Sequence, residues 1–216
     1  MSIRINQTIP NFSATTDQGV IDFHQWMNGS WTILFSHPKD FTPVCTTEFA
    51  IVAQLENEWQ KRNTKVIGIS VDSAEQHRNW KKDIESFGGT DVAFPIIADD
   101  DMEISKLLDM LPAEAYLPDG RTAADTATVR SVLIIGPDKK LKLTLTYPMN
   151  IGRNFDEILR VLDGLQLAAA QNVATPANWS PGDNIVIPVT VSDAEASAKY
   201  GEFEKHFSYL RTAQPV

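Results

Sequence analysis

The chain has 216 residues, of which 43% are hydrophobic and 22% charged, and its 28 acidic residues against 19 Lys and Arg give a net charge of −9. This is the composition of a globular protein, and its acidic balance argues against a nucleic-acid-binding face, which needs clustered positive charge. No apolar run reaches the roughly 18 residues of a membrane span, and the single cysteine, Cys45, excludes an intrachain disulfide and a thiolate zinc cluster.

The amino-terminal part of the chain alternates segments typical of strands with segments typical of helices. Strands are predicted where β-branched and other apolar residues cluster between turn residues, over 9–16, 20–24, 31–36, 65–71 and 94–98. Helices are predicted where apolar residues recur three and four apart, over 43–62, 74–87 and from the acidic turn 99–101 to about 110. The first two strands are expected to pair across residues 17–19, and Ser73 is the expected N-cap of the helix over 74–87.

A second hairpin and one more helix follow. Residues 111–128 show no clear period and contain a Pro-Asp-Gly turn at 118–120. Strands are predicted over 129–135 and 141–147 around a Gly-Pro-Asp turn, and Asn154 is the expected N-cap of a helix to about 169. Alternating strands and helices predict a mostly parallel sheet, to which the hairpin adds antiparallel strands. We therefore expect an α/β fold with a thioredoxin-like core, a central mixed sheet flanked by helices.

The last segment differs in character from the rest. It contains Thr-Pro and Ser-Pro-Gly-Asp turns, an apolar run at 185–189 that fits an edge strand, and a stretch at 192–206 with helical character. A segment of this length is too short for a convincing independent core. We therefore expect two parts: a thioredoxin-like domain of residues 1–165, and a small C-terminal extension of residues 166–216 that packs on its own domain or makes a dimer contact.

The stretch around Cys45 carries the chemistry. Thr42 is a favourable N-cap and Pro43 a favoured first helical residue, which places Cys45 at the third helical position. There the sulfur lies beside unpaired backbone N–H groups and the positive end of the helix dipole, which favours the thiolate. A readily formed thiolate is also a weaker nucleophile, so the site needs further donors for the transition state. Attack on a peroxide suits this arrangement, because a hydroxyl, backbone N–H groups and a guanidinium can stabilise charge on the leaving oxygen.

The spacing Pro-x-x-x-Thr-x-x-Cys, formed by Pro38, Thr42 and Cys45, resembles the active-site motif of the peroxiredoxin family. Longer strings resemble the one-cysteine branch of that family, namely residues 36–48, Arg130 with 136–143, 152–158 and 174–179. The resemblance covers nearly the whole chain. It implies a thiol-dependent peroxidase that reduces hydrogen peroxide and organic hydroperoxides through a cysteine sulfenic acid.

The resemblance implies catalytic roles for four residues. Cys45 is implied as the peroxidatic cysteine, and Thr42 as a hydrogen-bonding partner of the peroxide. Arg130 is implied to orient the thiolate and the peroxide, and Pro38 to shield the pocket from water. These four residues form the expected catalytic set.

Three further residues are implied around them. His37 and Arg153 are implied to line the substrate site, and Glu48 to position an arginine. Spacing alone does not select Arg130 over Arg121 or Arg153, so that assignment depends on the resemblance.

The resemblance also implies partners. No metal and no organic cofactor are expected, and because the chain lacks a resolving cysteine, an external thiol of the thioredoxin or glutathione type must reduce the sulfenic acid. A homodimer or a higher homo-oligomer is expected, without nucleic acid or a membrane span. A lone thiol also fits a reducing compartment, and the expected location is the cytoplasm.

Two other functions are weighed against the peroxidase. Ser30, His24 and Asp138 match the residue types of a lipid-hydrolysing serine site, but Ser30 precedes a strand and lacks flanking glycines at the spacing of a nucleophile elbow. We therefore expect no such hydrolysis. A redox sensor uses the same kind of thiol as a peroxidase and is distinguished from it by turnover.

Possible metal ligands have simpler interpretations. The acidic run 99–101 is interpreted as a solvated turn with an N-cap, because no EF-hand spacing follows it. His24, His77 and His206 have no ligand-like spacing and are interpreted as structural or exposed.

Overall fold

The computed structural model describes residues 3–116 and 126–216, and its contacts divide the chain into two compact units, residues 1–153 and 154–216. The boundary expected at 165/166 falls inside helix α6 (Phe155–Gln171), which the contacts group with the C-terminal unit. The turn expected at 118–120 lies outside the described residues. The N-terminal unit therefore ends 12 residues earlier than the sequence suggests, and the C-terminal unit is longer by the same 12 residues.

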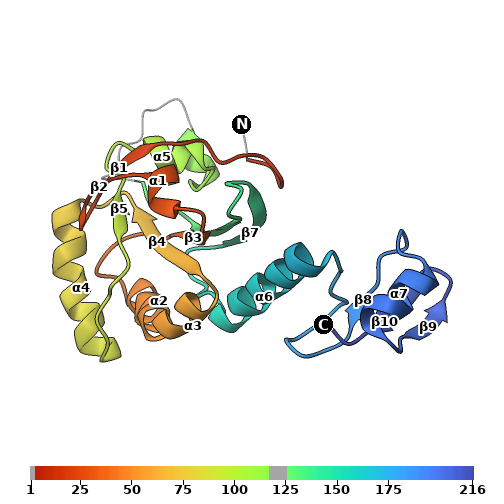
Figure 1. Cartoon of the computed structure of the whole chain (residues 1–216). Helices are drawn as coiled ribbons and strands as arrows, with labels where there is room; N and C mark the ends of the chain where they lie inside the picture. The colour runs from red at the N-terminus through yellow and green to blue at the C-terminus, as the bar shows by residue number, and fades with distance from the viewer. Residues whose placement is uncertain (1–2, 117–125) are drawn as a thin grey trace. The chain divides into compact units, whose positions relative to one another are not determined.

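The N-terminal unit is built on a seven-stranded mixed sheet with the order β2-β1-β5-β4-β3-β6-β7 (Figure 1). The strands are β1 (Ser13–Thr16), β2 (Gly19–Asp22), β3 (Trp31–Ser36), β4 (Thr64–Ser70), β5 (Ile96–Ala98), β6 (Arg130–Ile135) and β7 (Leu141–Tyr147). β3, β4 and β5 are parallel, and the two hairpins add the antiparallel strands at either side. The predicted α/β thioredoxin-like core with a mixed sheet is confirmed.

Helices cover both faces of this sheet (Figure 1). They are α1 (Phe23–Met27), α2 (Pro43–Gln54), α3 (Glu56–Lys61), α4 (Ala74–Gly88), α5 (Glu103–Leu107) and the short 3-10 helix η1 (Ala113–Tyr116). The prediction of a single helix over 43–62 is wrong, because the helix is interrupted at Leu55. Beyond the break, the buried indole of Trp59 donates to the carbonyl of Val52, one of the acceptors that the end of α2 leaves open.

Alternation along the strands sorts the core into two layers. Leu34, Ile67 and Ile69 face the cluster that contains residues of α1 and α5. Phe35 points to the opposite face, where its ring packs against Phe49 of α2 at 4.9 Å between centroids. Because successive side chains of a strand point to opposite faces, these few positions fix which helices cover which face. The face that carries α2 is the one that holds Cys45.

Gly68 lies at the point where β4 passes under Phe49. A Cβ atom at this position would lie 3.0 Å from Phe49 Cζ and 3.1 Å from Cε1. We expect Gly68→Ala to lower the free energy of unfolding by about 1–3 kcal/mol, because the buried ring must shift. Urea denaturation measures this. Gly152→Ala is the matched control, since its Cβ would meet Val44 Cγ1 at an ordinary 3.5 Å, and equal losses in the two variants would contradict the prediction.

The acidic run before α5 is a solvated turn only in part, because Asp100 and Asp101 are exposed and Asp99 is not. Asp99 is buried, and its carboxylate accepts from the backbone N–H groups of Ile104 at 2.9 Å and Ser105 at 2.6 Å. Burial raises the pKa of Asp99 above its usual value, although these hydrogen bonds act against the shift. The sequence interpretation was wrong on burial because Asp99 follows β5 directly and is carried into the interior with it. The helix is also shorter than expected, ending at Leu107.

The C-terminal unit has its own three-stranded sheet, with the order β8-β10-β9. Its elements after α6 are β8 (Ile185–Val186), α7 (Asp193–Tyr200), β9 (Glu204–Phe207) and β10 (Leu210–Ala213). Asn154 caps α6 as predicted, and β8 is an edge strand as predicted. The helix expected to continue to residue 206 ends at Gly201 (φ 73°), and the hairpin β9–β10 was missed.

A small apolar core explains why this extension folds. The buried residues are Val173, Ile185, Ile187, Ala196 and Ala213. The guanidinium of Arg211 ties the unit together by donating to Asp193 Oδ1 and to the carbonyls of Pro188 and Val191. The extension therefore has more internal structure than its length suggested.

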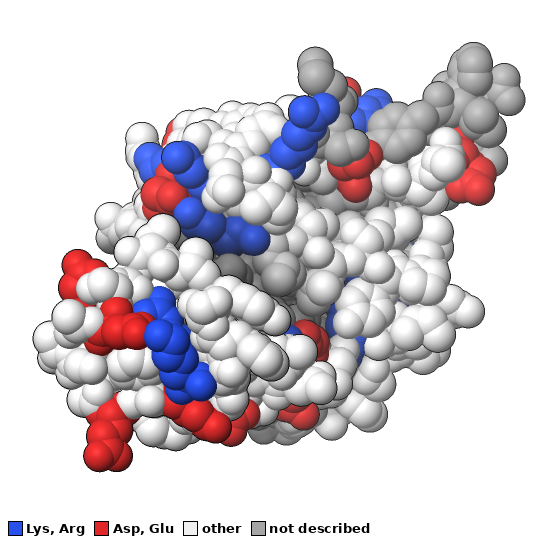
Figure 2. All heavy atoms as spheres, turned by 90° about the vertical axis from the view of Figure 1, so that its right-hand side faces the viewer, with Lys and Arg blue, Asp and Glu red and all other residues white. Residues whose placement is uncertain are grey.

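Two surface properties bear on function. No helix within residues 3–116 and 126–216 combines the length and apolarity needed to cross a membrane. On the face shown in Figure 2, basic and acidic side chains of the described residues lie interspersed among neutral ones.

Candidate active site

The first turn of α2 presents Cys45. Thr42 occupies the N-cap position with an extended backbone, Pro43 is the first helical residue, and Cys45 is fully buried at the third. The predicted capping hydrogen bond is absent: the Thr42 hydroxyl donates to the carbonyl of Lys39 at 2.9 Å instead. The position of Thr42 was therefore predicted correctly, but not the partner of its side chain. Its oxygen keeps lone pairs that can accept a further hydrogen bond.

Arg130, the first residue of β6, reaches the sulfur. Its Nη1 lies 3.2 Å from Cys45 Sγ and also donates to Glu48 Oε2 at 2.8 Å. Nε and Nη2 both donate to the carbonyl of Met149, at 2.8 and 2.6 Å. Because three of its nitrogens are engaged, the guanidinium is fixed in one orientation with a positive charge against the sulfur.

Glu48 joins Arg130 to a second arginine. Its Oε2 accepts from Arg153 Nη2 at 2.6 Å, and its Oε1 accepts from Arg153 Nε at 3.0 Å and from the Arg153 backbone N–H at 2.8 Å. Arg153 Nη1 donates to the carbonyls of Ser36 and Ser131. Arg153 is thus buried and committed to this network, and the structure places it behind Glu48.

Burial and charge oppose each other in this network. Burial alone would raise the pKa of Glu48, but the hydrogen bonds and positive charge of Arg153, with the charge of Arg130, hold it below its usual value of 4.5. Burial lowers the pKa of Arg153 from its usual value, although Glu48 acts against that shift. An ionised Glu48 therefore keeps two buried guanidinium groups in place beneath the thiol.

This network predicts a pH-dependent stability. A carboxyl whose pKa is depressed on folding stabilises the protein above its ordinary pKa, and this contribution is lost as the pH falls through the folded-state value. We expect Glu48→Gln to lower the free energy of unfolding by about 3 kcal/mol at pH 7, since it leaves buried arginines uncompensated. The deficit should shrink as the pH falls below 4.5. Urea denaturation at neutral and acid pH checks this, and a deficit independent of pH would contradict it.

His37 and Pro38 begin the loop that connects β3 to α2. Both residues are buried. The His37 ring stacks on Trp80 of α4 at 4.9 Å between centroids and meets the edge of Phe49 at 4.6 Å. Pro38 has no backbone N–H, so this part of the loop adds no donor that would compete for the peroxide.

Two polar residues of this region, Asp40 and His77, were not predicted to lie at the site, although His77 is structural, as one of the two interpretations of the sequence had it. Asp40 Oδ1 lies 2.7 Å from His37 Nε2, and Asp40 Oδ2 lies 2.7 Å from His77 Nδ1. Asp40 stands three residues after His37, which was a usable signal, but His77 lies 37 positions beyond Asp40 and only the fold brings it there. These groups offer three metal-ligating atoms within 4.8 Å of one another. Since each of those atoms already pairs with a neighbour, the geometry is that of a hydrogen-bonded cluster.

Comparison with known proteins identifies the family. The AhpC/TSA family model matches residues 5–144, and the model of the C-terminal domain of 1-Cys peroxiredoxin matches residues 164–202. The chain belongs to the peroxiredoxin family. With one cysteine and this C-terminal match, it falls in the one-cysteine branch and is a thiol-dependent peroxidase.

Similar proteins span nearly the whole chain. It is 47% identical to mitochondrial peroxiredoxin PRX1 of Saccharomyces cerevisiae, covering 97% of this chain and 80% of that protein. It is 49% identical to peroxiredoxin-6 of Gallus gallus, covering 95% of each. The crystal structure of the C45S mutant of Arenicola marina peroxiredoxin 6 superimposes with a TM-score of 0.92 at 44% identity, covering 100% of this chain and 99% of that one.

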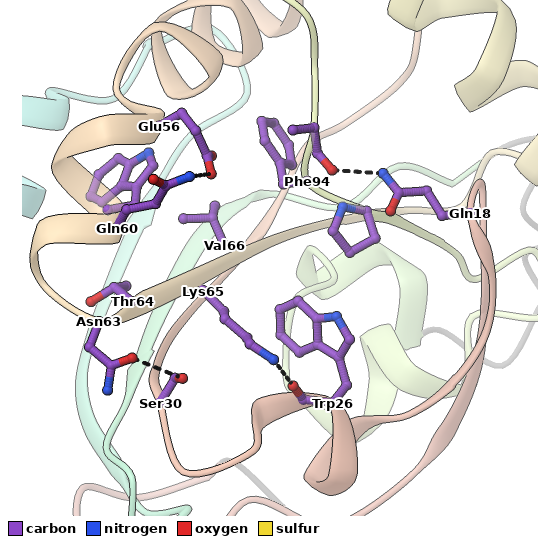
Figure 3. A pocket seen from close by; sticks show the side chains of 13 residues that line it. Gln18, Trp26, Ser30, Glu56, Gln60, Asn63, Thr64, Lys65, Val66 and Phe94 are labelled. Carbon is purple, nitrogen blue, oxygen red and sulfur yellow. Dashed lines mark hydrogen bonds between the residues drawn. The ribbon is translucent and has the colours of Figure 1, made fainter.

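Ser30, His24 and Asp138 do not form a hydrolytic site in this structure. The Ser30 hydroxyl donates to Asn63 Oδ1 at 3.3 Å, and both residues line a cavity of about 450 Å³ (Figure 3). His24 Nε2 bonds to the carbonyl of Ile9 at 2.8 Å, and Asp138 pairs with Lys142 at 2.7 Å. Each member of the set thus has a different partner, and a serine without a base is not activated.

The variant Ser30→Ala tests the conclusion that Ser30 is not a hydrolytic nucleophile. We expect the variant to match the wild type in hydrolysis of a fluorogenic phospholipid, because the partner of the serine hydroxyl among the described residues is the Asn63 amide, which is not a general base. Its peroxidase rate should also be unchanged, since Ser30 lies outside the Cys45 network. A loss of lipid hydrolysis that is specific to Ser30→Ala, with full retention of peroxidase activity, would contradict the prediction.

Proposed function

We propose that Cys45 is the peroxidatic cysteine and that Arg130, Thr42 and Pro38 complete its catalytic site. The observation that carries this proposal is the 3.2 Å contact between Arg130 Nη1 and Cys45 Sγ. A buried thiol with a fixed guanidinium against it is arranged for a reaction in which negative charge leaves the sulfur and builds on an adjacent atom.

In the proposed step, the Cys45 thiolate attacks one oxygen of the hydroperoxide. An S–O bond forms and the O–O bond breaks, so the sulfur is oxidised to a sulfenic acid and the peroxide is reduced. The second oxygen leaves with the bonding electron pair, takes up a proton and departs as water or an alcohol. Arg130 stabilises charge first on the sulfur and then on the leaving oxygen, while Thr42 Oγ1, whose own hydrogen is held by Lys39, accepts from the peroxide O–H.

We propose that an external thiol regenerates the enzyme. The chain has one cysteine, so the sulfenic acid must react with a thiol from another molecule, which releases water and leaves a mixed disulfide. A second thiol then frees Cys45 as the external disulfide forms. A structure of yeast mitochondrial 1-Cys peroxiredoxin, 44% identical to this chain, is described with thiol resolution via glutathione and thioredoxin systems, which supports reductants of these two types.

The experiment is a reductant screen with turnover as its readout. Reduced protein is mixed with hydrogen peroxide or an alkyl hydroperoxide and with glutathione or thioredoxin, and peroxide consumption is followed with mass spectrometry of Cys45. We expect many equivalents of peroxide to be consumed per chain with at least one of the two. Consumption that stops near one equivalent with both would instead identify a redox sensor.

We propose a homodimer and a cytoplasmic location as the setting for this activity. β7 lies at an edge of the seven-stranded sheet, where its backbone can pair with a second copy, and the C-terminal unit provides an additional surface for dimer contact. A single unpaired thiol is compatible with a reducing compartment. Analytical ultracentrifugation tests the assembly, and fractionation of the source cells tests the location, since the yeast relative is mitochondrial.

A further inference from the structure

A buried cluster of two imidazoles and one carboxylate lies beside the active-site helix. Asp40 accepts from both rings, at 2.7 Å to His37 Nε2 and at 2.7 Å to His77 Nδ1. The side chains of the two histidines are 0% exposed and that of Asp40 is 1% exposed. Asp72 lies behind them and accepts from the backbone N–H of Asp40 at 2.9 Å.

The partners of His77 fix where its protons are. Its Nε2 lies 3.1 Å from the carbonyl of Ile97, which can only accept, so this nitrogen carries hydrogen. Its Nδ1 faces a carboxylate oxygen. Burial would raise the pKa of Asp40, but its hydrogen bonds from His37 and His77 hold it below the usual value, so the carboxyl is ionised. His77 therefore carries hydrogen on both nitrogens, and its positive charge balances Asp40.

His37 is left neutral with one bare nitrogen. Its Nε2 carries the hydrogen donated to Asp40, and its Nδ1 has no hydrogen-bond partner among the described residues although it is fully buried. Burial lowers the pKa of His37, and this effect exceeds the opposing influence of Asp40. A neutral imidazole protonated at Nε2 has a lone pair at Nδ1 that can only accept.

The ring that carries this lone pair lies against the helix that holds the thiol. The ring meets the side chain of Phe49, which follows Cys45 on α2 by about one helical turn. Trp80, which stacks on the same ring, donates its indole N–H to the hydroxyl of Thr46, the residue after Cys45. A buried acceptor without a partner in this position is costly unless a ligand donates to it.

We propose that Asp40 and His77 are positioning residues for the peroxidase reaction: they hold His37 with hydrogen on Nε2, so that its bare Nδ1 shares the hydroxyl hydrogen of the hydroperoxide with Thr42 Oγ1 at the reacting centre. The inference rests on the proposed role of Cys45. His77 supplies the positive charge that keeps the Asp40 carboxylate from drawing a second proton onto His37. The cluster thereby keeps a second acceptor, besides Thr42 Oγ1, available to the peroxide.

The first test needs no turnover. In the wild-type protein labelled with nitrogen-15 histidine, long-range proton–nitrogen spectra should show His37 with hydrogen on Nε2 only and His77 with hydrogen on both nitrogens. Resonances are assigned with His37→Gln and His77→Gln. A wild-type His37 with hydrogen on Nδ1 would overturn the proposal, and this result is independent of whether Cys45 reacts with peroxide.

The second test is the pH profile of oxidation. In His77→Gln the neutral amide can still donate to Asp40, but the balancing charge is gone, so His37 takes up the proton and Nδ1 becomes a donor. We expect the second-order rate constant for oxidation to fall roughly tenfold at slightly acid pH, the worth of one hydrogen bond, and to recover as the pH rises. Ionisation of the Cys45 thiol affects both proteins, so the quantity that should fall as the pH rises is the ratio of the wild-type to the variant rate constant. The other charges near the cluster, Asp72, Lys39 and Arg153, are unchanged in the variant.

A matched control removes a carboxylate from the turn between β1 and β2 that pairs with another part of α4. Asp17 pairs with Lys81 of this helix at 2.6 Å and has no contact with His37. Asp17→Asn should destabilise the protein without altering the His37 spectrum or the pH profile. A profile for His77→Gln that matches wild type, or one that Asp17→Asn reproduces, would refute the positioning role. Stoichiometric zinc in the purified protein would also refute it, because a metal would occupy the nitrogens assigned to hydrogen.

Discussion

Replacement of Cys45 by serine is expected to abolish peroxide turnover. The serine oxygen keeps the position and nearly the size of the sulfur, but a hydroxyl remains protonated at neutral pH and is a poor nucleophile without a base. The described side chain that contacts the sulfur is Arg130, which can donate but cannot accept a proton. We therefore expect a loss on the order of 10⁴-fold or more, to the background rate.

Stopped-flow oxidation and coupled turnover measure this loss. Ser30→Ala provides a control at a buried hydroxyl outside the network, and unfolding curves establish that the serine variant keeps its fold. Because Cys45 is the one cysteine of the chain, labelling of the protein with a thiol reagent reports on this residue alone. Peroxide consumption that persists in Cys45→Ser would end the assignment of the reaction to this sulfur.

The sequence predicted the local structure around the thiol better than the network behind it. Thr42 and Pro43 are signals for the start of a helix, and they place Cys45 correctly because capping depends on residues adjacent in the chain. The bond from the Thr42 hydroxyl to Lys39 depends on the path of the preceding loop, where Phe41 has a positive φ of 55°. A residue pattern carries little information on such a loop.

The longer-range parts of the site needed the fold. Arg130 lies 85 positions from Cys45, and only the antiparallel pairing of β3 with β6 brings its strand beside the active-site helix. Spacing does not distinguish it from other arginines, and the family resemblance did. The cluster of Asp40 with His77 was missed for the same reason, since His77 belongs to α4 and meets Asp40 only after that helix packs on the sheet.

Misplaced elements have a common physical origin. The helix expected over 43–62 has uninterrupted apolar periodicity, yet a tertiary hydrogen bond between the Trp59 indole and Val52 accompanies a break at Leu55. In the C-terminal unit, Gly201 ends α7 and the chain continues as a hairpin. In both cases the intrinsic preference of the segment is weaker than the packing that the finished fold provides.

Replacement of Arg130 by alanine is expected to slow oxidation of Cys45 by about 10²–10³-fold, the usual cost of losing one fixed donor to a developing negative charge. The guanidinium acts at two points of the reaction, holding the thiolate and then the leaving oxygen. Its loss should leave Glu48 paired with Arg153, whose contacts are separate, so the protein is expected to remain folded. The defect should therefore be found in the rate constant for oxidation.

A lysine at this position separates charge from geometry. Arg130→Lys keeps a positive charge but cannot hold Glu48, the Met149 carbonyl and the sulfur at once, as the planar fork does. We expect it to recover only a small part of the lost rate. Arg62→Ala, which removes a partly exposed arginine paired with Glu58, serves as the control and should oxidise like the wild type. If Arg130→Lys oxidised at the wild-type rate, a positive charge alone would suffice, and the fixed orientation of the guanidinium would have no catalytic part.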